Sequence, residues 1–128
     1  MTGEHRYEEA AAGQLALLHE VAVRHPTAFG YLLQAIDLAL APRREVALAG
    51  DPEGVAALAS VVREARRPHL VLAAGSGEGP TMVPLMEDRS RPDAPARAAA
   101  YVCERFACQM PVTEPDELRT LLAQSTGR

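Results

Sequence analysis

The sequence predicts an α/β fold: an N-terminal helical hairpin packed on a small, mostly parallel sheet of three to four strands, with a C-terminal helix. Three observations predict this fold. In the first forty residues, apolar residues recur at three- and four-residue steps, which is the period of a helix. Residues 45–49, 69–74 and 98–106 are short apolar runs, typical of buried strands. A segment with helical spacing separates the first two runs, and such a strand–helix–strand unit is normally a right-handed crossover with parallel strands.

We expect two domains, a helical hairpin over residues 1–42 and a small α/β domain over residues 43–128. The first helix has one apolar stripe: Tyr7, Ala11, Leu15, Leu18 and Val21 or Ala22. Pro26 ends this helix, and a short link then predicts an antiparallel partner. The stripe of the second helix consists of Phe29, Leu32, Leu33, Ile36 and Leu40. Further apolar residues widen the surface beyond the two stripes: Leu17, Ala28, Leu38 and Ala39. Two helices alone cannot bury so much, so the hairpin requires another layer.

The second domain begins with the strand over 45–49, which ends at Gly50-Asp51-Pro52. Asp51 is suited to cap a helix N-terminus, and Pro52 is suited to its first position. The helix that follows is expected over residues 53–66, because its apolar residues line one face. Pro68 closes it before the second strand.

The remaining chain is expected to hold one or two more strands and a helix. Residues 75–80 form a flexible loop in this interpretation, residues 81–86 a short strand, and residues 87–97 a solvated connection rich in Arg, Asp and Pro. The third apolar run, 98–106, is the next strand. Pro115 opens the final helix, whose apolar face consists of Leu118, Leu121 and Leu122.

Size and charge exclude several classes of protein. The chain has 128 residues and a mass of 13.7 kDa, enough for a core that buries about two-thirds of the unfolded surface. Its formal net charge is −4, which argues against nucleic-acid binding, because phosphates need a concentrated basic surface. No apolar stretch approaches the roughly 18 residues of a membrane span, and no secretion signal is visible. We therefore expect a cytoplasmic protein with neither nucleic acid nor membrane as partner.

Two glycine-containing segments are candidate ligand sites. Gly50 and Asp51 follow the first strand, where open α/β sheets bind ligands, although capping by Asp51 explains the same residues without a ligand. The glycines of 75–79 also follow a strand, but the residues after them are a poor helix start and a P-loop lysine is absent. We interpret that segment as a loop. The histidines lack metal-ligand spacing, and the two cysteines form no C-x-x-C, so neither metal nor cofactor is expected.

Cys103 and Cys108 are the strongest chemical candidates. In one continuous strand they would point to opposite faces, so bridging them requires a hairpin turn over residues 104–107. Closing so short a loop would stabilise the fold by about 2 kcal/mol, and a cytoplasmic compartment disfavours permanent disulfides. Three interpretations stay open: packed or paired structural cysteines, a labile disulfide, or a working redox pair. Arg105 is the only cation between the two cysteines in the sequence, and Glu104 partly offsets it.

The cysteines lie within a recognisable signature. Residues 101–115 read Tyr-Val-Cys-Glu-Arg-Phe-Ala-Cys-Gln-Met-Pro-Val-Thr-Glu-Pro, and Glu117-Leu118 follow. This segment resembles the C-terminal end of the thioredoxin-domain-containing, spermatogenesis-associated and bacterial YyaL-like protein family. Residues 44–52 resemble that family's Glu-Val-hydrophobic-Gly-Asp segment, and the helix pair around Pro26 fits the stretch just upstream. The resemblance spans nearly the whole chain in order.

The resemblance implies a much longer polypeptide. Members of this family have an N-terminal thioredoxin-like domain and a central helical toroid similar to sugar epimerases and six-hairpin glycosidases. This chain would correspond to the last toroid helices and a small α/β appendage. Because it contains neither a thioredoxin C-x-x-C nor most of a toroid, the resemblance assigns no catalytic residue to it.

Three functions follow as hypotheses. The first is a non-catalytic structural and interaction module of a larger protein, with the helical face over 7–40 contacting the remainder of that polypeptide or a second copy. The second is thiol–disulfide chemistry by Cys103 and Cys108. The third, part of a carbohydrate-active enzyme, rests on fold analogy alone. We do not expect this chain by itself to be an enzyme.

Overall fold

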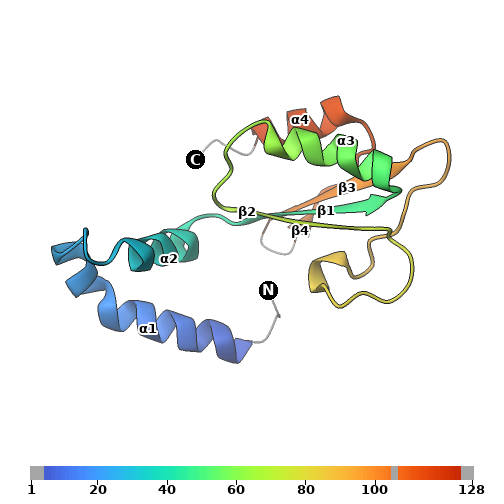
Figure 1. Cartoon of the computed structure of the whole chain (residues 1–128). Helices are drawn as coiled ribbons and strands as arrows, with labels where there is room; N and C mark the ends of the chain where they lie inside the picture. Colours follow the sequence, from blue (N-terminus) through green and yellow to red (C-terminus); the bar gives the residue numbers. More distant parts are fainter. Residues whose placement is uncertain (1–4, 105–106, 125–128) are drawn as a thin grey trace. The chain divides into compact units, whose positions relative to one another are not determined.

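The protein is described by a computed structural model over residues 5–104 and 107–124. Its chain divides into two compact units, Met1–Pro42 and Arg43–Arg128. The first contains two helices, α1 (His5–Arg24) and α2 (Gly30–Leu40). The second contains strands β1 (Arg44–Gly50), β2 (Leu70–Gly75), β3 (Ala98–Glu104) and β4 (Ala107–Cys108), helices α3 (Pro52–Arg63) and α4 (Pro115–Gln124), and the 3-10 helix η1 (Pro84–Met86) (Figure 1). The predicted α/β fold class is confirmed.

In the first unit, α1 and α2 pack against each other as a hairpin. Ala22 is buried, and six side chains of the two predicted stripes are partly buried: Leu15, Leu18, Phe29, Leu32, Leu33 and Ile36. The other stripe residues, Tyr7, Ala11, Val21 and Leu40, are exposed. The chain turns around Pro26, where the Ala28 N–H donates to the His25 carbonyl at 3.0 Å. Even so, none of the eleven residues of α2, all of them described, is buried. The hairpin therefore leaves much of its apolar surface uncovered.

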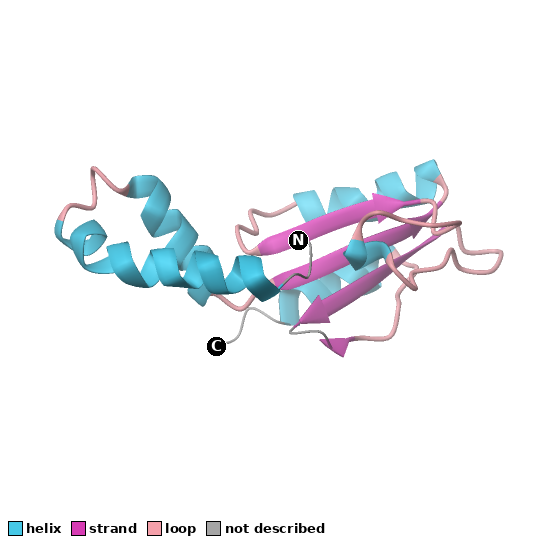
Figure 2. Cartoon of the chain, turned by 90° about the horizontal axis from the view of Figure 1, so that it is seen from below, coloured by secondary structure: helices cyan, strands magenta, loops and turns pink. Residues whose placement is uncertain are grey.

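The second unit is built on a four-stranded sheet in the order β2-β1-β3-β4 (Figure 2). β1 and β2 are parallel, with Arg44 opposite Leu70 and Ala49 opposite Gly75. β3 lies on the other side of β1 and is antiparallel to it, and β4 is antiparallel to β3. β1 is thus central and paired along both edges.

The sheet is mixed rather than mostly parallel, because β3 reverses direction. The connection between β2 and β3, residues 76–97, holds one short 3-10 helix and no helix that could carry the chain back along the sheet. β3 therefore starts at the end of the sheet where β1 and β2 finish, with Ala98 opposite Gly50. A parallel strand would have needed a crossover of the kind that α3 supplies between β1 and β2.

The main core lies between the sheet and the helices α3 and α4, which both cover one face (Figure 1). Successive side chains of a strand point to opposite faces, so alternate residues of β1 and β3 reach this core. Its buried members are Val46, Leu48, Leu58, Ala59, Val61, Val62, Ala98, Ala100, Val102, Leu118 and Leu122. Arg44 links the two layers at one end: its Nε donates to Glu104 Oε1 at 2.8 Å and its Nη1 to the Leu122 carbonyl at 3.0 Å.

The opposite face of the sheet carries small side chains and is covered by the 76–97 connection. Ala47 and Ala49 of β1 pack there with Met86 and Leu85 of η1, and with Tyr101 of β3. The short strand expected over 81–86 is wrong. Pro84 has no N–H for a strand ladder, and the Met86 N–H instead donates to the Val83 carbonyl at 2.8 Å to form η1.

Two predicted boundaries also move. α3 ends at Arg63 rather than residue 66. Beyond its end, Arg67 Nη1 donates to the Val62 carbonyl at 2.7 Å and satisfies one of the last carbonyls of the helix. β3 ends at Glu104, and residues 105–106 of the predicted strand lie outside the described residues.

Candidate functional site

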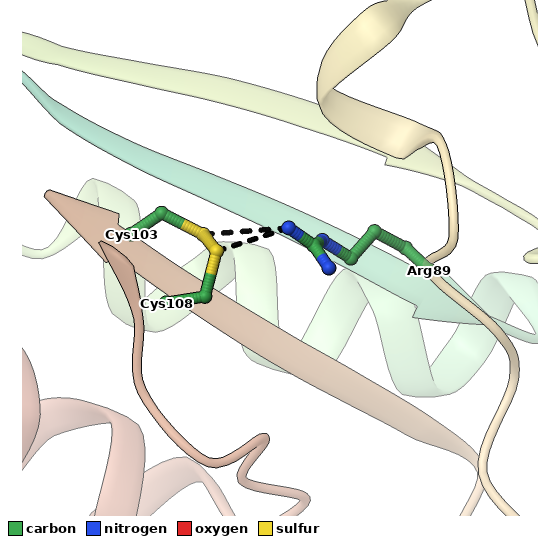
Figure 3. The surroundings of a disulfide bond; sticks show 3 residues. All are labelled: Arg89, Cys103 and Cys108. Atoms are coloured by element: carbon green, nitrogen blue, oxygen red, sulfur yellow. Dashed lines mark hydrogen bonds between the residues drawn. A yellow bond between two sulfur atoms is a disulfide. The ribbon is translucent and has the colours of Figure 1, made fainter. Parts of the chain in front are cut away.

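The two cysteines are bonded to each other as a disulfide at the end of β3 (Figure 3). Cys103 belongs to β3 and Cys108 to β4, and the two residues are directly opposite in the antiparallel pair. The Gln109 N–H donates to the Val102 carbonyl at 2.9 Å, so the backbone hydrogen bonds of this ladder flank the cysteine pair. Directly opposite residues without mutual backbone bonds bring their side chains closest together, which suits a disulfide.

The strand reversal that a bridge requires is present. Glu104 pairs with Ala107 in the antiparallel arrangement of β3 and β4, as the bridged interpretation required. Arg105, the cation that the sequence places between the cysteines, lies outside the described residues. Within the described residues, the charge next to the sulfurs comes from another arginine.

That residue is Arg89, in the connection between β2 and β3. Its Nη2 donates to Cys108 Sγ at 2.9 Å and lies 3.8 Å from Cys103 Sγ, so one guanidinium contacts both sulfurs (Figure 3). Arg89 reaches them because Cys103 and Tyr101, two residues apart on β3, point to the same face of the sheet, the face that the connection covers. Sequence reasoning missed Arg89, because nothing in its spacing from the cysteines distinguishes it from other arginines of the 87–97 segment.

Tyr101 holds the Arg89 side chain in place. The Arg89 Cζ lies 5.2 Å from the centroid of the Tyr101 ring, within range of a cation–π contact. The Tyr101 hydroxyl donates to the Ser90 carbonyl at 2.8 Å, which fixes the backbone next to Arg89. Tyr101 therefore positions both the guanidinium and the segment that carries it.

Arg89 lacks an acidic partner within the described part of the chain. Among residues 5–104 and 107–124, no carboxylate forms an ion pair with it, and its buried Nε has no hydrogen-bond partner. The neighbouring carboxylate of Glu104 is instead engaged by Arg44. The positive charge of Arg89 is thus directed at two sulfur atoms that are neutral while they are bonded.

The two cysteines differ in their access to solvent. Cys103 is 2% exposed, whereas Cys108 on the edge strand is exposed. Thiol–disulfide exchange proceeds by attack of a thiolate on an accessible disulfide sulfur, and a cation nearby stabilises the thiolate that is released. The arrangement therefore has the parts needed for exchange: an accessible sulfur, a buried partner and a cation at both.

The other candidate pair, Gly50 and Asp51, lies at the carboxyl end of β1. Asp51 Oδ1 accepts from the Gly54 N–H at 2.8 Å as the N-cap of α3, and Oδ2 accepts from Arg97 Nε at 2.8 Å. These two hydrogen bonds, the backbone one first, hold the pKa of the Asp51 carboxyl below its ordinary value. Both carboxylate oxygens are engaged, which agrees with the capping interpretation. A Cβ on Gly50, whose φ is +155°, would lie 2.3 Å from the Arg97 carbonyl oxygen, so this position requires glycine.

The remaining candidates do not converge on a site. Within the described ranges, no three of the His, Cys, Asp and Glu side chains are grouped so as to hold a metal ion. The 75–80 glycines lead into a loop and then η1, not into an α-helix that could bind a phosphate. Among the helices that the structure describes, none combines the length and the apolar character needed to cross a bilayer.

Comparison with known proteins finds similarity to spermatogenesis-associated protein 20. The rat protein is 28% identical over an alignment 130 residues long, which covers 97% of this chain and 16% of the rat protein. The human protein is 28% identical over 127 residues and the mouse protein 27% identical over 129 residues, again with 16% of each covered. This chain is therefore similar to one segment of a much larger protein. No family model and no solved structure matches the chain.

Proposed function

We propose that this chain is a structural and interaction module of a larger polypeptide of the thioredoxin-domain-containing, spermatogenesis-associated and YyaL-like family. In this proposal, the α1–α2 hairpin docks on the remainder of that polypeptide, a helical toroid with a thioredoxin-like domain before it. The observation that carries the proposal is the uncovered surface of α2, in which Tyr31 is 90% and Leu40 81% exposed.

The occupant of this surface follows from the relatives. Exposed apolar side chains also line α1, where Leu17 is 75% exposed, and a patch of this kind normally marks an interface. Each relative has more than five-sixths of its length outside the matching segment, since the match covers 16% of it. Helices of that remaining length would supply the layer that the hairpin lacks.

The proposal predicts that the isolated chain self-associates through α2. In sedimentation velocity experiments, we expect the weight-average sedimentation coefficient to rise with protein concentration. Charged substitutions Tyr31→Glu and Leu40→Glu together should abolish the rise while leaving the circular dichroism of the folded chain unchanged. The matched control is Met82→Glu, because Met82 is equally exposed but lies in the 76–97 connection. A wild-type chain that remains monomeric at all concentrations and binds no hydrophobic dye would contradict the proposal.

A second function, thiol–disulfide exchange by Cys103 and Cys108, is favoured by a separate observation. The contact of Arg89 with both sulfurs is a feature that a purely structural bridge does not need. In this proposal the cysteines cycle between a disulfide and two thiols, with a dithiol of a partner protein or domain as the reductant.

Intact mass under non-reducing, denaturing conditions tests this second function. We expect freshly purified protein to resist a thiol-blocking reagent, and protein equilibrated with a reduced dithiothreitol buffer to accept two blocking groups. Return to an oxidised dithiothreitol buffer should restore the unblocked form. A bridge that never forms, or one that reduces only when the chain is unfolded, would argue against exchange and leave only the structural role.

A further inference from the structure

We propose that Cys108 is the sulfur that exchanges with external thiols, that Cys103 is its internal resolving partner, and that Arg89 stabilises the thiolates formed at both. This assignment rests on the second proposed function and adds roles for the individual residues. It follows from three asymmetries at the site: accessibility, the position of the guanidinium, and the position of the nearest carboxylates.

Accessibility assigns the attacked sulfur. An incoming thiolate must approach along the axis of the S–S bond and contact the sulfur that it attacks. Cys108 is exposed on the two-residue edge strand β4, whereas Cys103 is 2% exposed between β1 and β4. Attack therefore takes place at Cys108 Sγ, and Cys103 is the leaving group.

The electron and proton balance is that of ordinary exchange with a dithiol. A thiolate of the dithiol attacks Cys108 Sγ, the Cys103–Cys108 bond breaks, and Cys103 Sγ leaves with the electron pair as a thiolate. The second thiol of the reductant loses its proton and attacks the reductant's own sulfur in the mixed disulfide, which releases Cys108 as a thiolate. Two electrons pass to the cysteines, the dithiol becomes a disulfide, and each cysteine thiolate can take up one proton.

The guanidinium of Arg89 is within reach of both thiolates. Nη2 is 3.8 Å from the sulfur that leaves first and 2.9 Å from the sulfur that is released last (Figure 3). Within the described residues Arg89 has no carboxylate partner. Reduction of the disulfide would therefore supply a negative charge, the cysteine thiolate, that pairs with its guanidinium. An ion pair of this kind favours the thiolate over the thiol and the reduced state over the disulfide.

The acidic residues around the site make Cys108 the more stable thiolate. Glu45 of β1 is directly opposite Cys103 and on the same face of the sheet, so its carboxylate opposes a negative charge on Cys103. Cys108 lies one strand farther from Glu45, a further distance of about 5 Å. Glu104 is bound by Arg44 on the face of α4, and Glu87 and Asp88 precede Arg89 without an ion pair to it among the described residues. Within the described ranges, Arg89 is the cation that contacts the sulfurs.

The first experiment measures alkylation by iodoacetamide against pH in the single-cysteine variants of the full chain. In Cys103→Ser, the remaining Cys108 should react with a midpoint pH below that of free cysteine, and Arg89→Gln in the same background should raise this midpoint. In Cys108→Ser, the buried Cys103 should react at least about tenfold more slowly when both are fully ionised. A Cys108 midpoint equal to that of free cysteine, or faster alkylation of Cys103, would overturn the assignment.

The second experiment measures the reduction equilibrium of the two-cysteine chain in dithiothreitol buffers. Loss of the Arg89 charge should make the bridge harder to reduce, with an equilibrium constant about tenfold lower in Arg89→Gln, or about 30 mV more negative. Arg89→Lys should recover part of this loss. Arg91→Gln is the matched control, because Arg91 lies two residues away and contacts Glu78 and Asp51 instead of sulfur.

These readouts separate the two levels of the proposal. A bridge that exchanges with dithiothreitol but has the same potential in Arg89→Gln and wild type would overturn the role of Arg89 and leave exchange intact. A bridge that exchanges with no thiol in the folded chain would remove the proposed function itself. Circular dichroism establishes that each variant is folded, and the alkylation midpoint of Cys108 in Cys103→Ser tests the charge effect without any change at Arg89.

Discussion

At the scale of single residues, Asp51 combines a cap and an ion pair on one carboxylate. The backbone N–H of Gly54 and the guanidinium of Arg97 both stabilise its charged form, which keeps the carboxyl pKa below its ordinary value. Arg97 in turn holds Glu53 through its Nη1 at 2.6 Å, so one arginine at the start of β3 joins the first turn of α3 to the sheet. The contributions of the helix cap and of the ion pair can be measured separately, because asparagine at position 51 retains the hydrogen-bond acceptor of the cap and loses the negative charge.

We predict that Asp51→Asn destabilises the protein at neutral pH and that the difference disappears in acid. A carboxyl whose pKa is lower in the folded than in the unfolded state adds stability above its unfolded pKa, and that stability is lost as the pH falls through the folded value. The melting temperature of Asp51→Asn should therefore lie a few degrees below that of the wild type at pH 7 and approach it below about pH 4. Thermal unfolding from pH 3 to pH 7 checks this, with exposed Asp93→Asn as the control. A pH-independent gap would mean that the ion pair contributes nothing.

The disulfide gives a second prediction at this scale. A bridge across five positions of sequence closes a short loop, and on the chain-entropy model it stabilises the fold by about 2 kcal/mol. Cys103→Ser with Cys108→Ser should lower the free energy of unfolding in urea by roughly that amount, and reduced wild type should match the double variant. If reduction leaves the urea midpoint unchanged, the bridge has no stabilising role.

At the scale of elements, the core depends on how α3 and α4 meet over the sheet. Leu118 and Leu122 of α4 are buried against Leu58, Val61 and Val62 of α3. On the surface of the same helix pair, Arg119 donates to both carboxylate oxygens of Glu64, at 2.9 Å from Nε and 2.7 Å from Nη2. This pair is exposed, so it fixes the helix register more than it adds stability.

We expect Leu118→Ala to cost about 2–5 kcal/mol of unfolding free energy, because it leaves a cavity in this layer. Leu17→Ala is the matched control: the chemical change is the same, but Leu17 is 75% exposed on α1, so its cost should stay within about 0.5 kcal/mol. Urea denaturation of both variants makes the comparison. Equal losses would mean that Leu17 is covered in solution.

The strands could be predicted from the sequence, but the direction of β3 and the position of Arg89 could not. The runs predicted over 45–49, 69–74 and 98–106 correspond to β1, β2 and β3, with the observed ends shifted by one or two residues, because each run is mainly apolar and too short for a helix. The direction of β3 was not predictable from its own residues, since an apolar run reads the same for either orientation. Its direction depends on the helix-free connection 76–97. Arg89 was missed for a related reason: its contact with Cys103 is created by that connection folding over the alanine face, not by any local spacing.

At the scale of the whole molecule, the two units differ in how much they bury. The second unit has buried residues on both faces of its sheet. In the helical hairpin, by contrast, only one of the described residues, Ala22, is buried. Segments with few buried apolar contacts open at low free-energy cost, independently of the rest of the chain. The hairpin should therefore be the less stable unit until its apolar surface is covered.

Hydrogen exchange tests this difference. We predict that the amides of α1 and α2 exchange at least about a hundredfold faster than those of β1 and β3, under conditions where the second unit is fully folded. Mass spectrometry of peptic peptides gives both rates from one sample. Equal protection of the hairpin and the sheet in the monomeric chain would contradict the expectation that the hairpin needs a further partner.

The strand order has one more consequence, for the behaviour of the protein in concentrated solution. β2 ends the sheet, so among the described residues the outer edge of Leu70–Gly75 has no strand beside it, while the outer edge of β3 is occupied by β4 and by the pairing of Ala100 with Val112. The sequence of that edge, Leu-Val-Leu-Ala-Ala-Gly, contains no charge and no proline. Such an edge is a template for strand addition by a second molecule, and natural sheets commonly protect theirs with lysine or proline. A single lysine at Val71, in a chain that has none, would therefore place a charge on this edge and oppose aggregation.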